Sequence, residues 1–137
     1  MNYSVGTLTT TADCQALINI ANSEKEAATY RQSGMVRQRQ SASINAAEIE
    51  AELAGVIAEL ETLQPLLETL PEGPFKVETL RKFKKSEYKK FLLEQRKGNY
   101  GVLALLEKEF DIACVEETIL ESEAFITALT ERMNALT

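Results

Sequence analysis

The apolar residues between positions 42 and 70 recur at alternating spacings of four and three, and this pattern constrains the fold more than any other feature of the sequence. In a helix with about 3.6 residues per turn, such spacing aligns side chains along one seam that packs beside a neighbouring helix. Pro65 lies within the pattern, but the phase is kept, so we expect a bent helix and not a helix end. The seam comprises Ala42, Ala46, Ile49, Leu53, Val56, Leu60, Leu63, Leu67 and Leu70.

Helix-breaking residues divide the chain at three places. Residues 70–75, with the sequence LPEGPF, contain two prolines and one glycine and are predicted to form a turn. A second break is expected at residues 97–101, where Gly98 has the usual place after a helix end. A third is expected at residues 41–45, where Ser43 is a candidate N-cap for a new helix.

No segment alternates with a period of two, so the sequence predicts an all-α protein without strands. Its fold class is predicted to be a four-helix up-and-down antiparallel bundle with long helices, forming a single helical-bundle domain over residues 1–137. The predicted helices span approximately residues 11–40, 44–70, 76–97 and 101–136.

Length and composition suit one ordinary domain, since the chain has 137 residues, of which 45% are apolar, and a formal net charge of −6. The first residues lack the basic start and apolar run of a secretion signal. No apolar stretch approaches the roughly 20 residues that cross a bilayer. We therefore expect a cytoplasmic protein.

The residue types that carry most enzyme chemistry are scarce. Histidine is absent, which removes the commonest general base and metal ligand. Cys14 and Cys114 lie 100 residues apart and match no metal or redox spacing, and both fall on apolar stripes, so we expect buried thiols without a disulfide. Glu117 is the one carboxylate that falls on an apolar face and is a candidate for a buried functional acid. We predict no catalytic residue, metal site or cofactor, and no enzyme.

Residues 76–97 hold nine of the fifteen basic residues and three of the 21 acidic ones, so this segment has a net charge of +6 and the remainder −12. A helical projection predicts that its apolar residues, including Leu80, Tyr88 and Phe91, face the core. Two interpretations of the basic side remain open: it pairs with acidic flanks of the chain's own helices, or it binds an external partner. The candidate interaction surface comprises Lys82, Lys85, Lys89, Lys90 and Lys97.

The predicted helix at 101–136 has two apolar faces. The first comprises Leu103, Leu106, Phe110, Ala113 and Leu120. The second comprises Leu105, Ile112, Ile119, Ile126 and Met133, joined by Val115, Leu129 and Leu136. Such a helix is central in a bundle, or bent, or paired with another copy of the chain. We predict a homo-oligomer in which the self-association surface comprises Ile119, Ile126, Leu129 and Met133.

These patterns predict a non-enzymatic helical-bundle module for interaction or assembly. The alternative is a binder of an acidic protein partner or an anionic surface through residues 76–97. Nucleic acid and membrane are the less favoured partners, because the strongly acidic remainder of the chain repels polyanions.

Overall fold

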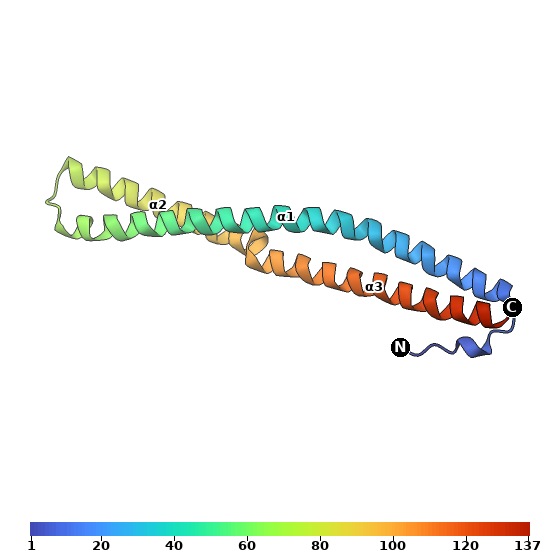
Figure 1. Ribbon diagram of the computed structural model, residues 1–137. Helices are drawn as coiled ribbons and strands as arrows, with labels where there is room; N and C mark the ends of the chain where they lie inside the picture. Colours follow the sequence, from blue (N-terminus) through green and yellow to red (C-terminus); the bar gives the residue numbers. More distant parts are fainter. The chain divides into compact units, whose positions relative to one another are not determined.

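A computed structural model describes all residues from 1 to 137, and it confirms the all-α class. A short 3₁₀ helix η1 (Val5–Thr7) precedes three α-helices, and no strand is present (Figure 1). The helices are α1 (Thr11–Thr69), α2 (Pro74–Tyr100) and α3 (Val102–Ala135). None of them has an apolar stretch of the length that crossing a bilayer requires.

α1 is one continuous helix where the sequence predicted two, so the chain has three α-helices instead of four. The predicted break at residues 41–45 was wrong. This segment contains no glycine or proline, and serine or asparagine costs only about 0.5 kcal/mol relative to alanine in a helix. The buried Ala46 and Ile49 follow directly and anchor the helix by packing. Tertiary burial therefore outweighs the weak local preference for a cap.

The other two predicted breaks are present. Gly73 has φ 154°, a backbone conformation that favours glycine, and Pro74 occupies the first turn of α2, where its missing N–H is not needed. α1 continues through Pro65, as predicted. The second break lies at Gly101 and not at Gly98, because α2 extends to Tyr100.

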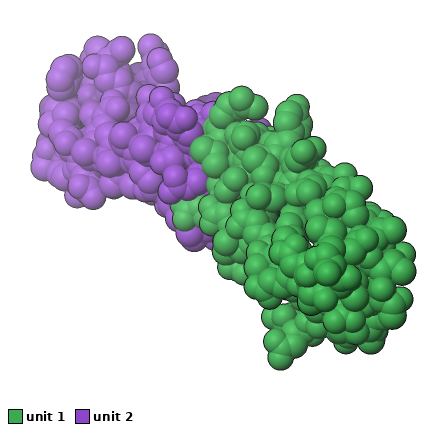
Figure 2. All heavy atoms as spheres, turned by 45° about the vertical axis from the view of Figure 1, so that its right-hand side comes forward, with its two compact units in different colours: residues 1–38, 109–137 green, residues 39–108 purple.

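The chain forms two compact units, coloured separately in Figure 2. Unit 1 comprises residues 1–38 and 109–137, and unit 2 comprises residues 39–108. Because α1 contributes residues to both units, the assignment of residues 1–137 to one domain stays a prediction.

Unit 2 pairs the second half of α1 with α2. Its core is the predicted seam: Ile49, Leu53 and Val56 are buried together with Leu93 of α2, and Leu60 packs against them. Since Leu93 lies near the end of α2 and contacts residues well before the end of α1, the two helices run antiparallel. The turn at residues 70–73 joins them.

Unit 1 pairs the first half of α1 with α3, also antiparallel. The Nζ of Lys25 lies 3.2 Å from Oε1 of Glu123, and the side-chain amide of Gln32 donates a hydrogen bond to Glu116. Small side chains of α1 allow close approach of the bulkier residues of α3. The buried core comprises Cys14, Ile18, Ala21 and Ala28 of α1 with Ile112, Val115 and Leu129 of α3.

The first eight residues pack onto unit 1. The ring centroids of Tyr3 and Phe125 are 4.5 Å apart, and the Tyr3 hydroxyl donates a hydrogen bond to the Glu121 carboxylate. The Arg132 guanidinium donates two hydrogen bonds to the Leu8 carbonyl, from Nε at 3.0 Å and from a terminal nitrogen at 2.8 Å. These contacts tie the N-terminal segment to α3.

Candidate interaction surface

The apolar side of α2 faces solvent, and the prediction that it faces the core was wrong. Tyr88 is 62% exposed and Phe91 is 53% exposed, and Val77 and Leu80 are also exposed. Phe83, another apolar residue of this segment, is half-buried. We name Val77, Leu80, Lys84, Tyr88 and Phe91 the α2 stripe.

A different side of α2 packs against α1. Thr79, Ser86 and Leu93 are its buried residues, and they recur every seven positions. The Thr79 hydroxyl is satisfied by donating to the Phe75 carbonyl at 2.9 Å. Small side chains fit here because the α1 seam already supplies bulky ones. The seven-residue spacing of Thr79, Ser86 and Leu93 was the sequence signal for this seam. The apolar residues of the helix indicated a different face.

The α2 stripe lies roughly 160° around the helix from the buried seam, at about 100° per residue. A single neighbouring helix cannot cover faces so far apart. Lys84 occupies the middle of the stripe and makes no ion pair. The stripe is therefore an apolar surface with one central cation.

The structure does not unite the five predicted lysines into one surface. Lys97 binds Glu50 of α1, with Nζ 2.7 Å from Oε1. Lys90 is half-buried and lies 3.9 Å from Glu94 on its own helix.

Lys82, Lys85 and Lys89 are exposed and make no ion pair. At about 100° per residue, they project from the flank of α2 that lies away from the α2 stripe. These three residues are the part of the predicted surface that is open to an external partner.

The predicted self-association surface of α3 lies on the face toward α1. Leu129 is fully buried, and Ile119, Ile126 and Met133 are half-buried on the face toward α1. Leu129 thus belongs to the core of unit 1, where small α1 side chains leave room for it, whereas Ile119, Ile126 and Met133 are only partly covered, so their part in self-association stays a prediction.

The other face of α3 is the exposed one: Phe110 is 69% exposed and Leu120 is 57% exposed. Ala113 and Glu117 are exposed between them, so Glu117 is not the buried acid that the pattern suggested. We name Phe110, Ala113, Glu117 and Leu120 the α3 stripe. Like the α2 stripe, it is an apolar row with one central charge of its own.

The cysteines are both free, as predicted, and differ in accessibility. Cys14 is fully buried, whereas Cys114 is exposed, which corrects the expectation of two buried thiols. Cys114 escapes burial because it lies beside the α3 stripe and not on the face toward α1. No group of three or more cysteine, aspartate or glutamate side chains is placed to hold a metal ion.

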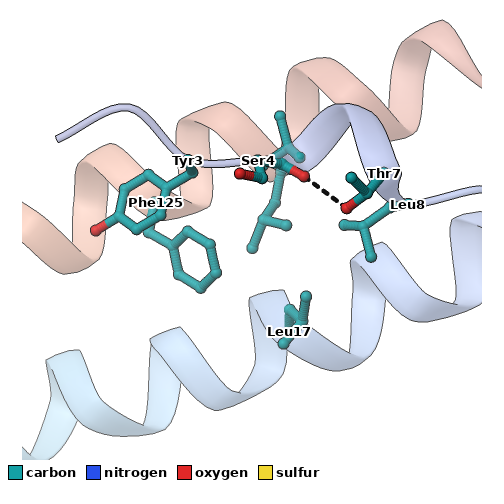
Figure 3. A pocket seen from close by; sticks show the side chains of 8 residues that line it. Tyr3, Ser4, Thr7, Leu8, Leu17 and Phe125 are labelled. Carbon is teal, nitrogen blue, oxygen red and sulfur yellow. Dashed lines mark hydrogen bonds between the residues drawn. The ribbon is translucent and has the colours of Figure 1, made fainter.

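A cavity of about 190 Å³ lies beneath the N-terminal segment in unit 1 (Figure 3). Leu17 of α1 and Phe125 of α3 line it, and Tyr3 lies beside Phe125 at its edge. The hydrogen bond to Glu121 raises the pKa of Tyr3 above 10.0, with further contributions from desolvation and from the carboxylate charge. The lining is mainly apolar and contains no pair of groups arranged for proton transfer. This cavity supports packing of the segment.

Comparison with known proteins identifies no relative: no protein-family model matches the chain, and no curated protein or solved structure is significantly similar to it.

Proposed function

We propose that this protein is a non-enzymatic assembly module of the cytoplasm, which associates with other helices through its exposed apolar stripes. The observation that carries the proposal is the exposure of Val77, Leu80, Tyr88 and Phe91 along one side of α2. A row of exposed apolar side chains of this kind typically marks a site of protein association.

The energetics favour covering such a row. Complete burial of one large apolar side chain contributes about 1.5–3 kcal/mol, and these four are still roughly half-exposed, so covering the remainder offsets part of the entropy cost of association. Aromatic residues such as Tyr88 and Phe91 are also enriched at the centres of interfaces. Helix docking is the association mode that fits a straight row on a helix.

The partner that we propose is a second copy of the chain. Each unit is built mainly on two helices, each of which buries one side against the other. One unit from each of two copies would together supply four helical segments to a shared core, and this homo-oligomer is the form in which we propose the four-helix up-and-down bundle. A four-helix core covers faces that a pair leaves open.

Sedimentation equilibrium of the purified chain tests this function. We expect the mean mass to rise from that of a monomer to that of an oligomer between about 1 and 200 μM, the range in which micromolar contacts become populated. A monomer mass throughout the range would contradict self-association. The variant F91S should shift the transition to higher concentration.

A second candidate function is binding of an acidic protein or anionic surface through Lys82, Lys85 and Lys89. The observation that favours it is that these three exposed cations have no ion-pair partner in the chain. Reversal of all three to glutamate should abolish binding to a polyglutamate peptide or to vesicles with anionic lipid, and leave thermal melts at low and high salt unchanged. Equal binding by the reversed variant would exclude this candidate.

A further inference from the structure

We propose that the α2 stripe of one copy packs antiparallel against the α3 stripe of a second copy, with Lys84 facing Glu117. This inference rests on the proposed self-association and specifies which two surfaces are in contact. It follows from three properties of the two stripes: their charges, their residue spacing and their shared lack of a partner.

Charge excludes the simplest alternative, in which α2 pairs with α2. Residues 76–97 have a net charge of +6, and an antiparallel pairing of two α2 stripes about their centres brings Lys84 against Lys84. Like charges that face each other across an interface cost free energy and reject that partner. The α3 stripe instead offers Glu117 at its centre. Neither Lys84 nor Glu117 makes an ion pair within its own chain, so both are available.

The spacing of the two stripes is matched from Leu80 to Phe91. When Lys84 faces Glu117 in an antiparallel pair, Leu80 lies within one position of Leu120, and the α2 stripe extends about one helical turn further, to Val77. Each stripe advances by three or four residues at a time, so its members stay on one side of the helix.

At the other end of the same register, Tyr88 lies across from Ala113 and Phe91 across from Phe110. A large side chain opposite a small one permits close approach of the helices, and two facing phenylalanine rings give a favourable aromatic contact. The register thus pairs sizes as well as charges.

A second copy is the occupant that the chain itself supplies, because every copy carries both halves of the contact. One type of contact covers the exposed apolar side chains of the α2 stripe and of the α3 stripe together. An unrelated acidic partner would cover the α2 stripe and leave Phe110 and Leu120 exposed.

A charge swap tests the register. We expect K84E and E117K each to raise the dissociation constant of self-association about tenfold or more, since each places like charges across the contact. The double variant K84E/E117K restores an opposite-charge pair and should return the constant to within about threefold of the wild type. Sedimentation equilibrium measures the constants, and circular dichroism verifies helix content.

The control is R96E, which makes the same change of charge on α2 away from the stripe and should alter the constant by less than about twofold. If the wild type associates but K84E has no effect, or the double variant shows no rescue, the proposed register is wrong. The proposed assembly function would still stand. A wild type that stays monomeric overturns both.

Labelling of Cys114 provides a second readout, because this exposed thiol lies beside the α3 stripe. Its rate of modification should fall as wild-type concentration rises, and should stay constant over the same concentrations for K84E. A wild-type rate that does not change while the mass increases would place the contact elsewhere.

Discussion

Lys97 of α2 and Glu50 of α1 form an ion pair across the helices of unit 2, with Nζ 2.7 Å from Oε1. The two side chains are 47% and 49% exposed, so water and salt screen their attraction. Exposed pairs of this kind contribute about 0–1 kcal/mol. The other pairs of α2 involve neighbours in sequence, such as Lys90 with Glu94. Most of the basic side chains of α2 therefore form no ion pair with the acidic side chains of α1.

Loss of this pair should be detectable but small. K97Q should lower the free energy of unfolding by less than about 1 kcal/mol at low salt, and the difference should shrink as salt is added. Chemical denaturation at two ionic strengths measures it. K85Q, which removes a cation without an ion-pair partner, is the control and should have no comparable effect. A loss in K97Q that salt leaves unchanged would show that packing, not charge, is responsible.

Substitution of Gly101 by alanine should lower the free energy of unfolding. A Cβ atom there would lie 2.4 Å from the backbone oxygen of Lys97, so the backbone at the α2–α3 junction must shift. We expect G101A to cost about 1–3 kcal/mol in urea denaturation, as for overpacked sites. G98A is the matched control: its Cβ meets nothing within 4 Å, and alanine in a helix should stabilise by about 0.5–1 kcal/mol. Equal stability of the two variants would contradict the described junction.

The Tyr3 hydroxyl should lose its proton at a higher pH than an ordinary tyrosine. Its pKa is raised above 10.0, so its contact with Glu121 contributes fully at pH values below 10.0 and is lost as the pH rises through the raised value. The tyrosinate absorbance of the wild type minus that of Y3F isolates the Tyr3 component. E121Q removes the facing charge and should move this component down toward 10.0. A component at or below 10.0 in the wild type would mean that the hydrogen bond is absent in solution.

The two thiols should react at different rates. At a protein concentration below that of the proposed self-association, a disulfide reagent should modify Cys114 rapidly and the fully buried Cys14 only on unfolding. One thiol per chain is then counted in buffer and two in denaturant. C114S should leave no fast phase. Rapid modification of both thiols in the native protein would indicate that the Cys14 end of α1 opens readily.

The sequence predicted well the elements that depend on a regular apolar seam or on the backbone limits of proline and glycine. Ile49, Leu53 and Val56 form a regular apolar seam that Leu93 of α2 covers, and the turn at residues 70–73 follows from the conformational limits of proline and glycine. The break at residues 41–45 was wrong because serine and asparagine express only weak preferences, which packing overrides.

The face of α2 that packs could not be predicted from apolarity. A hydrophobic pattern reports how much surface avoids water, but it does not tell whether a helix of the same chain or another molecule covers it. In α2, Thr79 and Ser86 fit the bulky α1 seam, while Tyr88 and Phe91 stay outside. In α3, the sequence revealed two apolar faces, but only the small residues of α1 decide that the Leu129 face is the inner one.

The boundaries of the two units have a consequence for dissecting the protein. The chain passes from one unit to the other between residues 38 and 39, inside α1, and between residues 108 and 109, inside α3. Neither passage is a loop that a protease or a cloning strategy can cut cleanly. Each cut would sever a hydrogen-bonded helical turn and create new ends with up to four unsatisfied N–H and four C=O groups. Separately expressed halves would therefore start with frayed ends that the intact chain does not have.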